Sequence, residues 1–270
     1  MSKLTMNIGF FPAFQFHHFL MLFLTAGVII VCKSCDPILL AGCSSYSSMT
    51  NVYILGLSYT NSTPSNLSPV SRNLSETLNG YKGASQLEVR AGYFGLCIRQ
   101  RGVVWLCSSD ANGLTTQIGS ENDPLDLIGA AAKFKDNVIF SGLLFMAVVL
   151  AFVSIILLAT FPTWRSERDE RTGSDVEVKP FPSRPVTHVA IACSLVASIL
   201  LLVSSLWQHV GSVGAAAMAD ISYQGNVHTA IGAQAVSMAW ASVILVVIPT
   251  IGLIVMILSI MALDRLTDDD

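Results

Sequence analysis

The chain has 270 residues, of which 52% are hydrophobic and only 12% are charged, and its formal net charge is -3 at pH 7. A soluble domain carries about 25% charged residues, so this composition predicts a membrane protein. The net charge is small and the Lys and Arg residues form no basic stripe, which argues against nucleic acid as a partner.

Four apolar segments contain no Asp, Glu, Lys or Arg and are long enough to cross a membrane as helices, which takes roughly 20 residues. They are Ile8–Val31, Val138–Phe161, Val189–Trp207 and Val236–Leu263. The fourth contains Pro249, where we expect a kink. Together they predict an all-α transmembrane four-helix bundle in a lipid bilayer.

The first segment also allows a second interpretation, a signal peptide that is cleaved. We expect a retained helix, because the segment is longer than the roughly 7 to 15 apolar residues of a signal sequence. It carries His17 and His18. Adjacent side chains on a helix point in different directions, so this pair favours packing or an interfacial position over a shared metal site.

The two shorter connections differ in charge. Residues 162–188 hold five of the fifteen Lys and Arg residues, whereas residues 208–235 hold none. The positive-inside bias therefore predicts that both termini are cytoplasmic. The expected divisions are helix 1 with a short cytoplasmic N-terminus (1–31), a glycosylated extracellular domain (32–136), helix 2 (137–161), a cytoplasmic loop (162–188), helix 3 (189–207), an extracellular loop (208–235), helix 4 (236–263) and a cytoplasmic tail (264–270).

The long external loop contains three sequons for N-glycosylation, at Asn61, Asn66 and Asn73, and the rest of the chain contains none. Chance could produce one sequon in a stretch rich in Ser and Asn, but three together favour exposure to the secretory lumen. The sequons thus support the extracellular placement of this loop independently of the charge pattern.

Five cysteines lie at or beyond the external face, where disulfides persist. They are Cys32, Cys35, Cys43, Cys97 and Cys107. An odd number leaves one thiol free, and Cys32 at the membrane edge is the natural candidate. Cys35 with Cys43 is then a candidate second bridge, although the pairing of the first three stays open. Cys193, inside the third span, is predicted to be a packing residue.

The segment "LEVRAGYFGLCIRQRGVVWLC" is rich in β-formers and predicts a hairpin centred near Gly102. About that centre Cys97 falls opposite Cys107. Directly opposed residues in an antiparallel pair can lie about 4.5 Å apart at Cα, within reach of a disulfide. Gly92 and Gly95 flank Tyr93 and Phe94, and glycine at such points permits a bulge or a close backbone approach. We expect the two aromatic residues to be exposed.

The end of the loop carries hard oxygen ligands of the type that calcium prefers. They are Asp110, Asn112, Glu121, Asp123 and Asp126. The glycine that follows Asn112 does not stand where an EF-hand loop requires one, so a solvated acidic loop is the better interpretation. The chain contains no nucleophile elbow, zinc-ligand cluster or phosphate loop, and we predict no enzyme activity, no metal site and no cofactor.

The pattern Gly, two bulky apolar residues, Gly, apolar residue, Cys, gap, Cys resembles the signature of the fungal factor-induced-gene-one family. Here it comprises Gly92, Tyr93, Phe94, Gly95, Leu96, Cys97 and Cys107. More distantly it resembles the two-cysteine motif of claudins, which share the four-span plan with a large first external loop. The Trp that claudins carry directly before the first Cys is missing, so a paracellular pore is not expected.

The resemblance implies a plasma-membrane protein that regulates low-affinity calcium influx and membrane fusion during fungal mating or cell fusion. Its fold would be the helical bundle with a small, disulfided, β-containing extracellular domain. Partners would be membrane proteins of the calcium-influx or fusion machinery, or further copies of the chain. Two alternatives remain, a calcium-conducting channel subunit and a claudin-like organiser of the cell cortex. The lack of acids and bases in the spans argues against an ion pathway within one chain.

Overall fold

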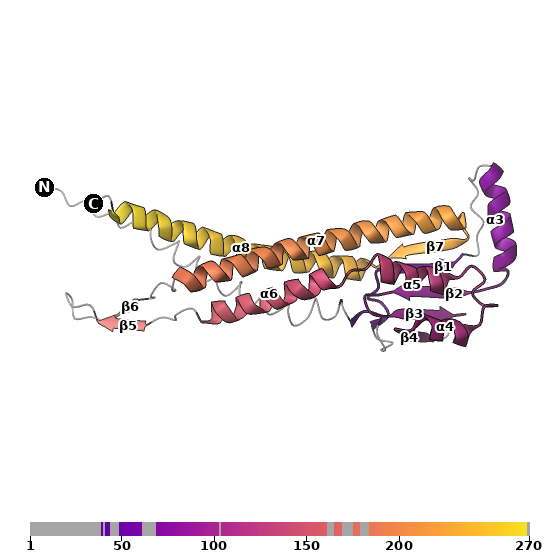
Figure 1. The fold of residues 1–270 in the computed structure, drawn as a ribbon, viewed down its shortest axis with the longest axis horizontal. Coiled ribbons are helices and arrows are strands. Elements are labelled where there is room, and N and C mark those ends of the chain that lie inside the picture. The colour runs from indigo at the N-terminus through magenta and orange to yellow at the C-terminus, as the bar shows by residue number, and fades with distance from the viewer. Residues whose placement is uncertain are drawn as a thin grey trace. The chain divides into compact units, whose positions relative to one another are not determined.

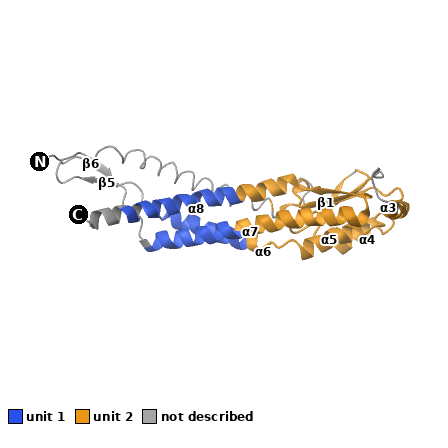
Figure 2. Cartoon of the chain, turned by 90° about the horizontal axis from the view of Figure 1, so that it is seen from above, with its two compact units in different colours: residues 1–33, 145–200, 243–270 blue, residues 34–144, 201–242 orange. Residues whose placement is uncertain are grey.

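The structure is a computed structural model that describes residues 39, 41–43, 49–60, 69–102, 104–160, 165–168, 175–178 and 184–268. The expected first helix, Cys32, Cys35, Asn61 and Asn66 lie outside these residues. The chain divides into two compact units (Figure 2). The span unit comprises residues 1–33, 145–200 and 243–270, and the sheet unit comprises residues 34–144 and 201–242.

Three helices are long and apolar enough to cross a membrane: α6 (Gly142–Ala159), α7 (Arg184–Tyr223) and α8 (Ala233–Asp268). They correspond to the second, third and fourth predicted spans. Large apolar side chains such as Phe152 and Ile156 stay exposed on α6, as expected for a surface that faces lipid. Pro249 lies inside α8. The protein is therefore a helical membrane protein with three apolar spans among its described residues.

Helix α7 does not end at Trp207, where the third span was expected to end. It has 40 residues, which corresponds to about 60 Å of helix, twice the thickness of a hydrocarbon core of about 30 Å. The residues after Trp207 are mostly small and include Ala215–Ala217, and alanine is the best helix former. The helix ends only where Gln224 and Gly225 adopt positive φ angles of 48° and 79°. The predicted loop 208–235 is thus largely helix and strand.

The sheet unit contains a five-stranded antiparallel sheet with the order β4-β3-β2-β1-β7 (Figure 1). Its strands are β1 (Leu55–Tyr59), β2 (Leu87–Ala91), β3 (Leu96–Gln100), β4 (Trp105–Ser108) and β7 (Val227–Ile231). Four strands come from residues 32–136, where the sequence predicted a β-hairpin. The fifth, β7, comes from residues 208–235, so the sheet needs both connections.

One face of the sheet is covered by helix α5 (Leu127–Asn137), which contacts β1, β2 and β3. Its buried residues are Leu127, Ile128, Ala131 and Phe134, spaced as one face of a helix. They meet the buried residues of β2, which alternate with half-buried ones along the strand. The core of the sheet unit lies between α5 and this face.

Two further helices belong to the sheet unit. Helix α4 (Ala111–Ile118) lies beside β4. Helix α3 (Pro69–Lys82) is bound to the turn between α7 and β7, where Ser75 Oγ donates to Gln224 O at 3.0 Å and Asn226 Nδ2 donates to Ser75 O at 3.0 Å. The buried face of α3 is therefore polar.

The span unit contains a cluster of hydroxyl groups between α7 and α8. The Oγ atoms of Ser194 and Ser198 lie 2.5 Å and 3.0 Å from Thr250 Oγ1. Such bonds hold transmembrane helices together without a charged group. In the connection between α6 and α7, which was predicted as a loop, β5 (Arg165–Arg168) pairs with β6 (Asp175–Val178) in antiparallel register.

Candidate functional site

The four residues Gly92–Gly95 form the turn between β2 and β3. Ala91 pairs with Leu96, and Gly92 N donates to Gly95 O at 2.9 Å. The turn carries Tyr93 and Phe94 at its tip, and their environments differ. Phe94 is 53% exposed, whereas Tyr93 is only 6% exposed. The prediction that both aromatic residues are exposed is therefore wrong for Tyr93.

Tyr93 is an anchor for the turn. Its hydroxyl donates to Gln208 Oε1 on α7 at 3.0 Å, and both side chains are buried. A buried phenol normally finds such a partner, because an unpaired hydroxyl in the core costs free energy. The bond ties the turn to the extension of α7, so Phe94 is presented from a fixed backbone.

Gly92 and Gly95 are required by close packing, not by unusual backbone angles. A Cβ on Gly92 would lie 2.3 Å from Gly42 O, and a Cβ on Gly95 would lie 2.0 Å from Cys43 O. Neither glycine has a positive φ. Residues 42–43 thus lie directly on the turn. This is the close backbone approach that glycine at these positions allows.

The Cys97–Cys107 disulfide joins β3 to β4 at directly opposed positions, with a Cα–Cα distance of 4.1 Å. Arg101 and Gly102 form the turn with φ angles of 49° and 73°. The hairpin is therefore centred on Gly102, and the predicted pairing of the two cysteines is present in the structure. We call residues 96–108 the cysteine hairpin.

The face of the sheet that carries the disulfide also carries a stack of arginine and aromatic side chains. The Arg90 guanidinium lies 4.6 Å from the ring centre of Tyr53 and 4.2 Å from that of Trp105. The Arg99 guanidinium lies 4.8 Å from the same Trp105 ring. Glu88 forms ion pairs with both arginines. We call these five residues the arginine stack.

The arginine stack was not predicted from the sequence. The alternation in "LEVRA" places Glu88 and Arg90 on one face of β2, which is a usable signal. The pairing of Arg99 with Trp105 across the cysteine hairpin follows from its register. Tyr53, however, precedes β1, and only the paired strands β1 and β2 bring it to Arg90. That contact could not be found from local patterns.

Cys43 has a free and fully buried thiol. The candidate bridge from Cys35 to Cys43 is therefore absent from the structure. Burial raises the pKa of the Cys43 thiol to about 12, although the nearby Arg90 charge acts in the opposite direction. The thiol is thus protonated at neutral pH, which makes it a poor nucleophile. Cys193 is also free and half-buried on α7, consistent with a packing role.

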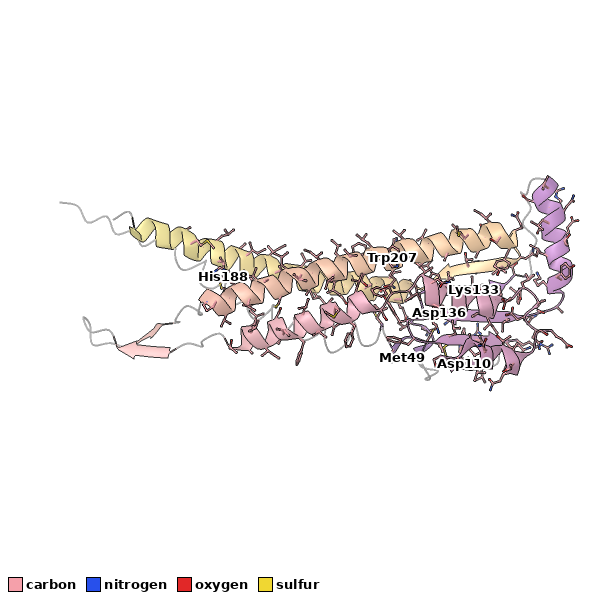
Figure 3. The ribbon with its side chains drawn as sticks, viewed as in Figure 1. Met49, Asp110, Lys133, Asp136, His188 and Trp207 are labelled. Atoms are coloured by element: carbon pink, nitrogen blue, oxygen red, sulfur yellow. A yellow bond between two sulfur atoms is a disulfide. The ribbon has the colours of Figure 1, made fainter. Side chains whose placement is uncertain are left out.

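Three aspartates of the last part of the loop, Asp110, Asp123 and Asp126, bind the first amides of helices, whereas Glu121 is exposed. Asp110 Oδ1 accepts from Asn112 N at 3.0 Å at the start of α4, and Figure 3 labels Asp110 beside that helix. Asp123 is buried, contrary to the predicted solvated loop. Its oxygens accept from Leu127 N and Ile128 N, each at 2.9 Å, and from the Tyr59 hydroxyl at 2.7 Å. Burial and this bond raise the pKa of Tyr59.

Among the described residues, no three His, Cys, Asp or Glu side chains come together in a way that could hold a metal ion. Asp110, Asp123 and Asp126 each cap a helix, and a carboxylate at a helix N-terminus interacts favourably with the helix dipole. Their sequence spacing therefore reflects two short helices in succession. Of the three sequons, only Asn73 is described, and it is exposed on α3.

The fold and the cysteine hairpin define the class of the protein: a multi-pass helical membrane protein with a disulfided antiparallel sheet. Within this class, the family model "Ca2+ regulator and membrane fusion protein Fig1" matches residues 73–259, so the chain belongs to the Fig1 family. The match includes the Gly92–Cys107 motif and the three described spans. The predicted family is thus confirmed. No curated protein matches the chain.

Proposed function

We propose that the chain is a four-span plasma-membrane protein that promotes low-affinity Ca²⁺ influx and membrane fusion during fungal mating or cell fusion, and that it does so by contacting other membrane proteins. It belongs to a family of regulators of Ca²⁺ and membrane fusion that is not known for enzymatic activity. In this proposal the sheet unit is a claudin-like extracellular domain, and the first apolar segment, residues 8–31, forms a further transmembrane helix beside α6, α7 and α8.

The chemistry of the spans supports a regulator over a conduit. Residues 142–159 and 233–259 contain no Asp, Glu, Lys or Arg, and neither do residues 189–207 of α7. Ionisable groups in the bilayer are costly and usually mark an ion pathway. The buried polar cluster between α7 and α8 consists of hydroxyl groups that bond to each other and to the backbone. These groups join helices, and none carries the charge that would attract Ca²⁺.

The observation that carries the proposal is the exposed face of the Gly92–Gly95 turn and the cysteine hairpin. Phe94 is exposed on a turn that is fixed by Tyr93 and by the backbone of residues 42–43. The arginine stack lies on the adjacent sheet face, held by two ion pairs to Glu88. Trp, Tyr and Arg are the residues most enriched at the centres of protein interfaces.

The charge of this surface indicates the kind of partner. Arg90 and Arg99 share one carboxylate, Glu88, and Arg101 stands exposed at the hairpin turn. The excess of positive charge favours a partner surface with acidic groups around an apolar pocket for Phe94. Because the surface is held rigid by the disulfide and the stacked rings, little conformational entropy is lost on binding.

The test is complementation of a deletion in the host. A Phe94→Ser variant should reach the plasma membrane, yet give less fusion-linked Ca²⁺ entry and fewer fused cells. Tyr81→Ser is the matched control, because Tyr81 is also an exposed aromatic residue but lies on α3. Full activity of a surface-localised Phe94→Ser protein would contradict the proposal. So would equal losses in both variants.

A further inference from the structure

A groove lies beside β7, at the edge of the sheet opposite β4. It has a volume of about 530 Å³ and lies between β7 and residues 213–220 of α7. Its lining includes Val213, Ala216, Ala217 and Asp220 from α7 and Thr229 and Ile231 from β7. All of these residues belong to the sheet unit. The groove shares no residue with the cysteine hairpin or the arginine stack.

The backbone of β7 offers unpaired hydrogen-bonding groups to this side. Thr60 N donates to Asn226 O at 3.1 Å, and Gly232 N donates to Ile54 O at 3.3 Å. Since the hydrogen-bonding direction alternates along an antiparallel strand, His228 and Ala230 also bond to β1. The N–H and C=O groups of the residues between them therefore point away from β1. These residues are Val227, Thr229 and Ile231, and all three line the groove.

An edge of this kind is a template for another strand. Within the described part of the chain, no backbone hydrogen bond joins these three residues to a further segment. Unpaired peptide groups beside an apolar wall are costly unless water or another main chain satisfies them. An extended polypeptide satisfies them in the regular spacing that a strand presents.

The walls of the groove specify the side chains of the occupant. Val213, Ala216 and Ala217 form a small apolar wall, which fits Val, Thr or Ala on alternate positions. Asp220 supplies a carboxylate that has no ion-pair partner among the described residues. A cationic side chain on the added strand would pair with it. A second copy of β7 would bring neither Lys nor Arg to Asp220, because residues 226–232 contain none and their single basic side chain is His228.

We propose that β7 and α7 form a strand-addition site that takes an extended, Val- and Thr-rich segment of a partner protein with a Lys or Arg opposite Asp220. This site goes beyond the regulatory function proposed above, because it uses a different edge of the sheet. Failure of one proposal would leave the other intact.

The first test uses the full chain in lipid nanodiscs and a labelled peptide of alternating Val and Thr with one Lys. The variants are Thr229→Pro, which removes one outward N–H, and Thr229→Ala, which keeps it. Proline is tolerated at an edge where its nitrogen faces outward. We expect Thr229→Ala to bind like the parent and Thr229→Pro to bind about tenfold more weakly, as expected when one buried hydrogen bond is lost. Asp220→Asn should weaken binding of the Lys peptide more than binding of a matched peptide with Gln in place of Lys.

Hydrogen exchange supplies the second readout. In the peptide-free protein, the amides of Val227, Thr229 and Ile231 should exchange faster than those of His228 and Ala230, and the peptide should slow them. Unchanged protection of His228 and Ala230 in Thr229→Pro shows that β7 still pairs with β1. If that protection is lost, the binding of the Lys and Gln peptides to Asp220→Asn tests the proposal instead. Protection of the outward amides before peptide is added would overturn the proposal, because the edge would already be covered by this chain or a second copy. Absence of peptide protection, or equal binding by a peptide methylated at its nitrogens, would overturn it too.

Discussion

Gly95→Ala should loosen the contact between the Gly92–Gly95 turn and residues 42–43. The new Cβ would lie 2.0 Å from Cys43 O and 3.0 Å from Cys43 C. These are backbone atoms, so no side-chain rotation relieves the clash, and the strands or the Cys43 segment must shift. Overpacking of this kind costs about 1 to 3 kcal/mol. We expect a loss of about 2 kcal/mol in the free energy of local opening.

Cys43 itself reports this opening. Its thiol is buried and its pKa is raised to about 12, so a thiol reagent reacts only when the segment opens. A loss of about 2 kcal/mol should increase the labelling rate of Cys43 roughly thirtyfold, since about 1.4 kcal/mol is a factor of ten. Peptide mass spectrometry of the labelled protein separates Cys43 from the other thiols.

Gly80→Ala is the control for the same substitution. No atom lies within 4 Å of a Cβ at Gly80, which is inside α3 and has no positive φ. Alanine should stabilise α3 by about 0.5 to 1 kcal/mol and leave Cys43 labelling unchanged. If Cys43 in the Gly95→Ala variant is labelled at a rate within about twofold of the parent rate, the packing argument for the two motif glycines is refuted.

Three further outcomes are expected. Because burial raises the pKa of Cys43 from 9.0 to about 12, the thiol contributes stability that is complete below pH 9.0 and is lost as the pH rises toward 12. The free energy of unfolding in urea should therefore fall more steeply with pH across this window for the parent than for Cys43→Ala. Equal slopes would show that the thiol is not desolvated. Non-reducing peptide mapping should find Cys97 joined to Cys107, and a bond from either to Cys35 or Cys43 would disprove the hairpin register. Endoglycosidase should lower the apparent mass of the protein, an effect that changing Asn61, Asn66 and Asn73 to Gln removes; an unglycosylated chain from a fungal host would count against the extracellular placement.

The sequence predicted those parts of the fold that depend on local pattern. The three described spans follow from apolar length, and the Cys97–Cys107 pairing follows from β-propensity about a central Gly102. The glycine spacing also predicted a close backbone approach, although it could not show that residues 42–43 make it.

Other features depended on contacts between distant parts of the chain. Strand β7 pairs with β1 across about 170 residues of sequence, and its five residues "VHTAI" give a weak signal on their own. Asp123 resembled a solvated acid until Tyr59 and the start of α5 were placed around it. Tyr93 and Phe94 are adjacent and chemically alike, and only the position of Gln208 on the extended α7 decides which of them is buried.

The most direct measurement of the proposed function is Ca²⁺ uptake by liposomes that contain the purified full chain alone and enclose a Ca²⁺ indicator. Acidic side chains are absent from residues 142–159, 189–207 and 233–259, so we predict no uptake above that of protein-free liposomes. The same chain, when expressed in a deletion strain, should restore Ca²⁺ entry and fusion. Sustained Ca²⁺ uptake by the chain alone, blocked by a pore-occluding cation, would contradict a purely regulatory role and identify the protein as the conduit.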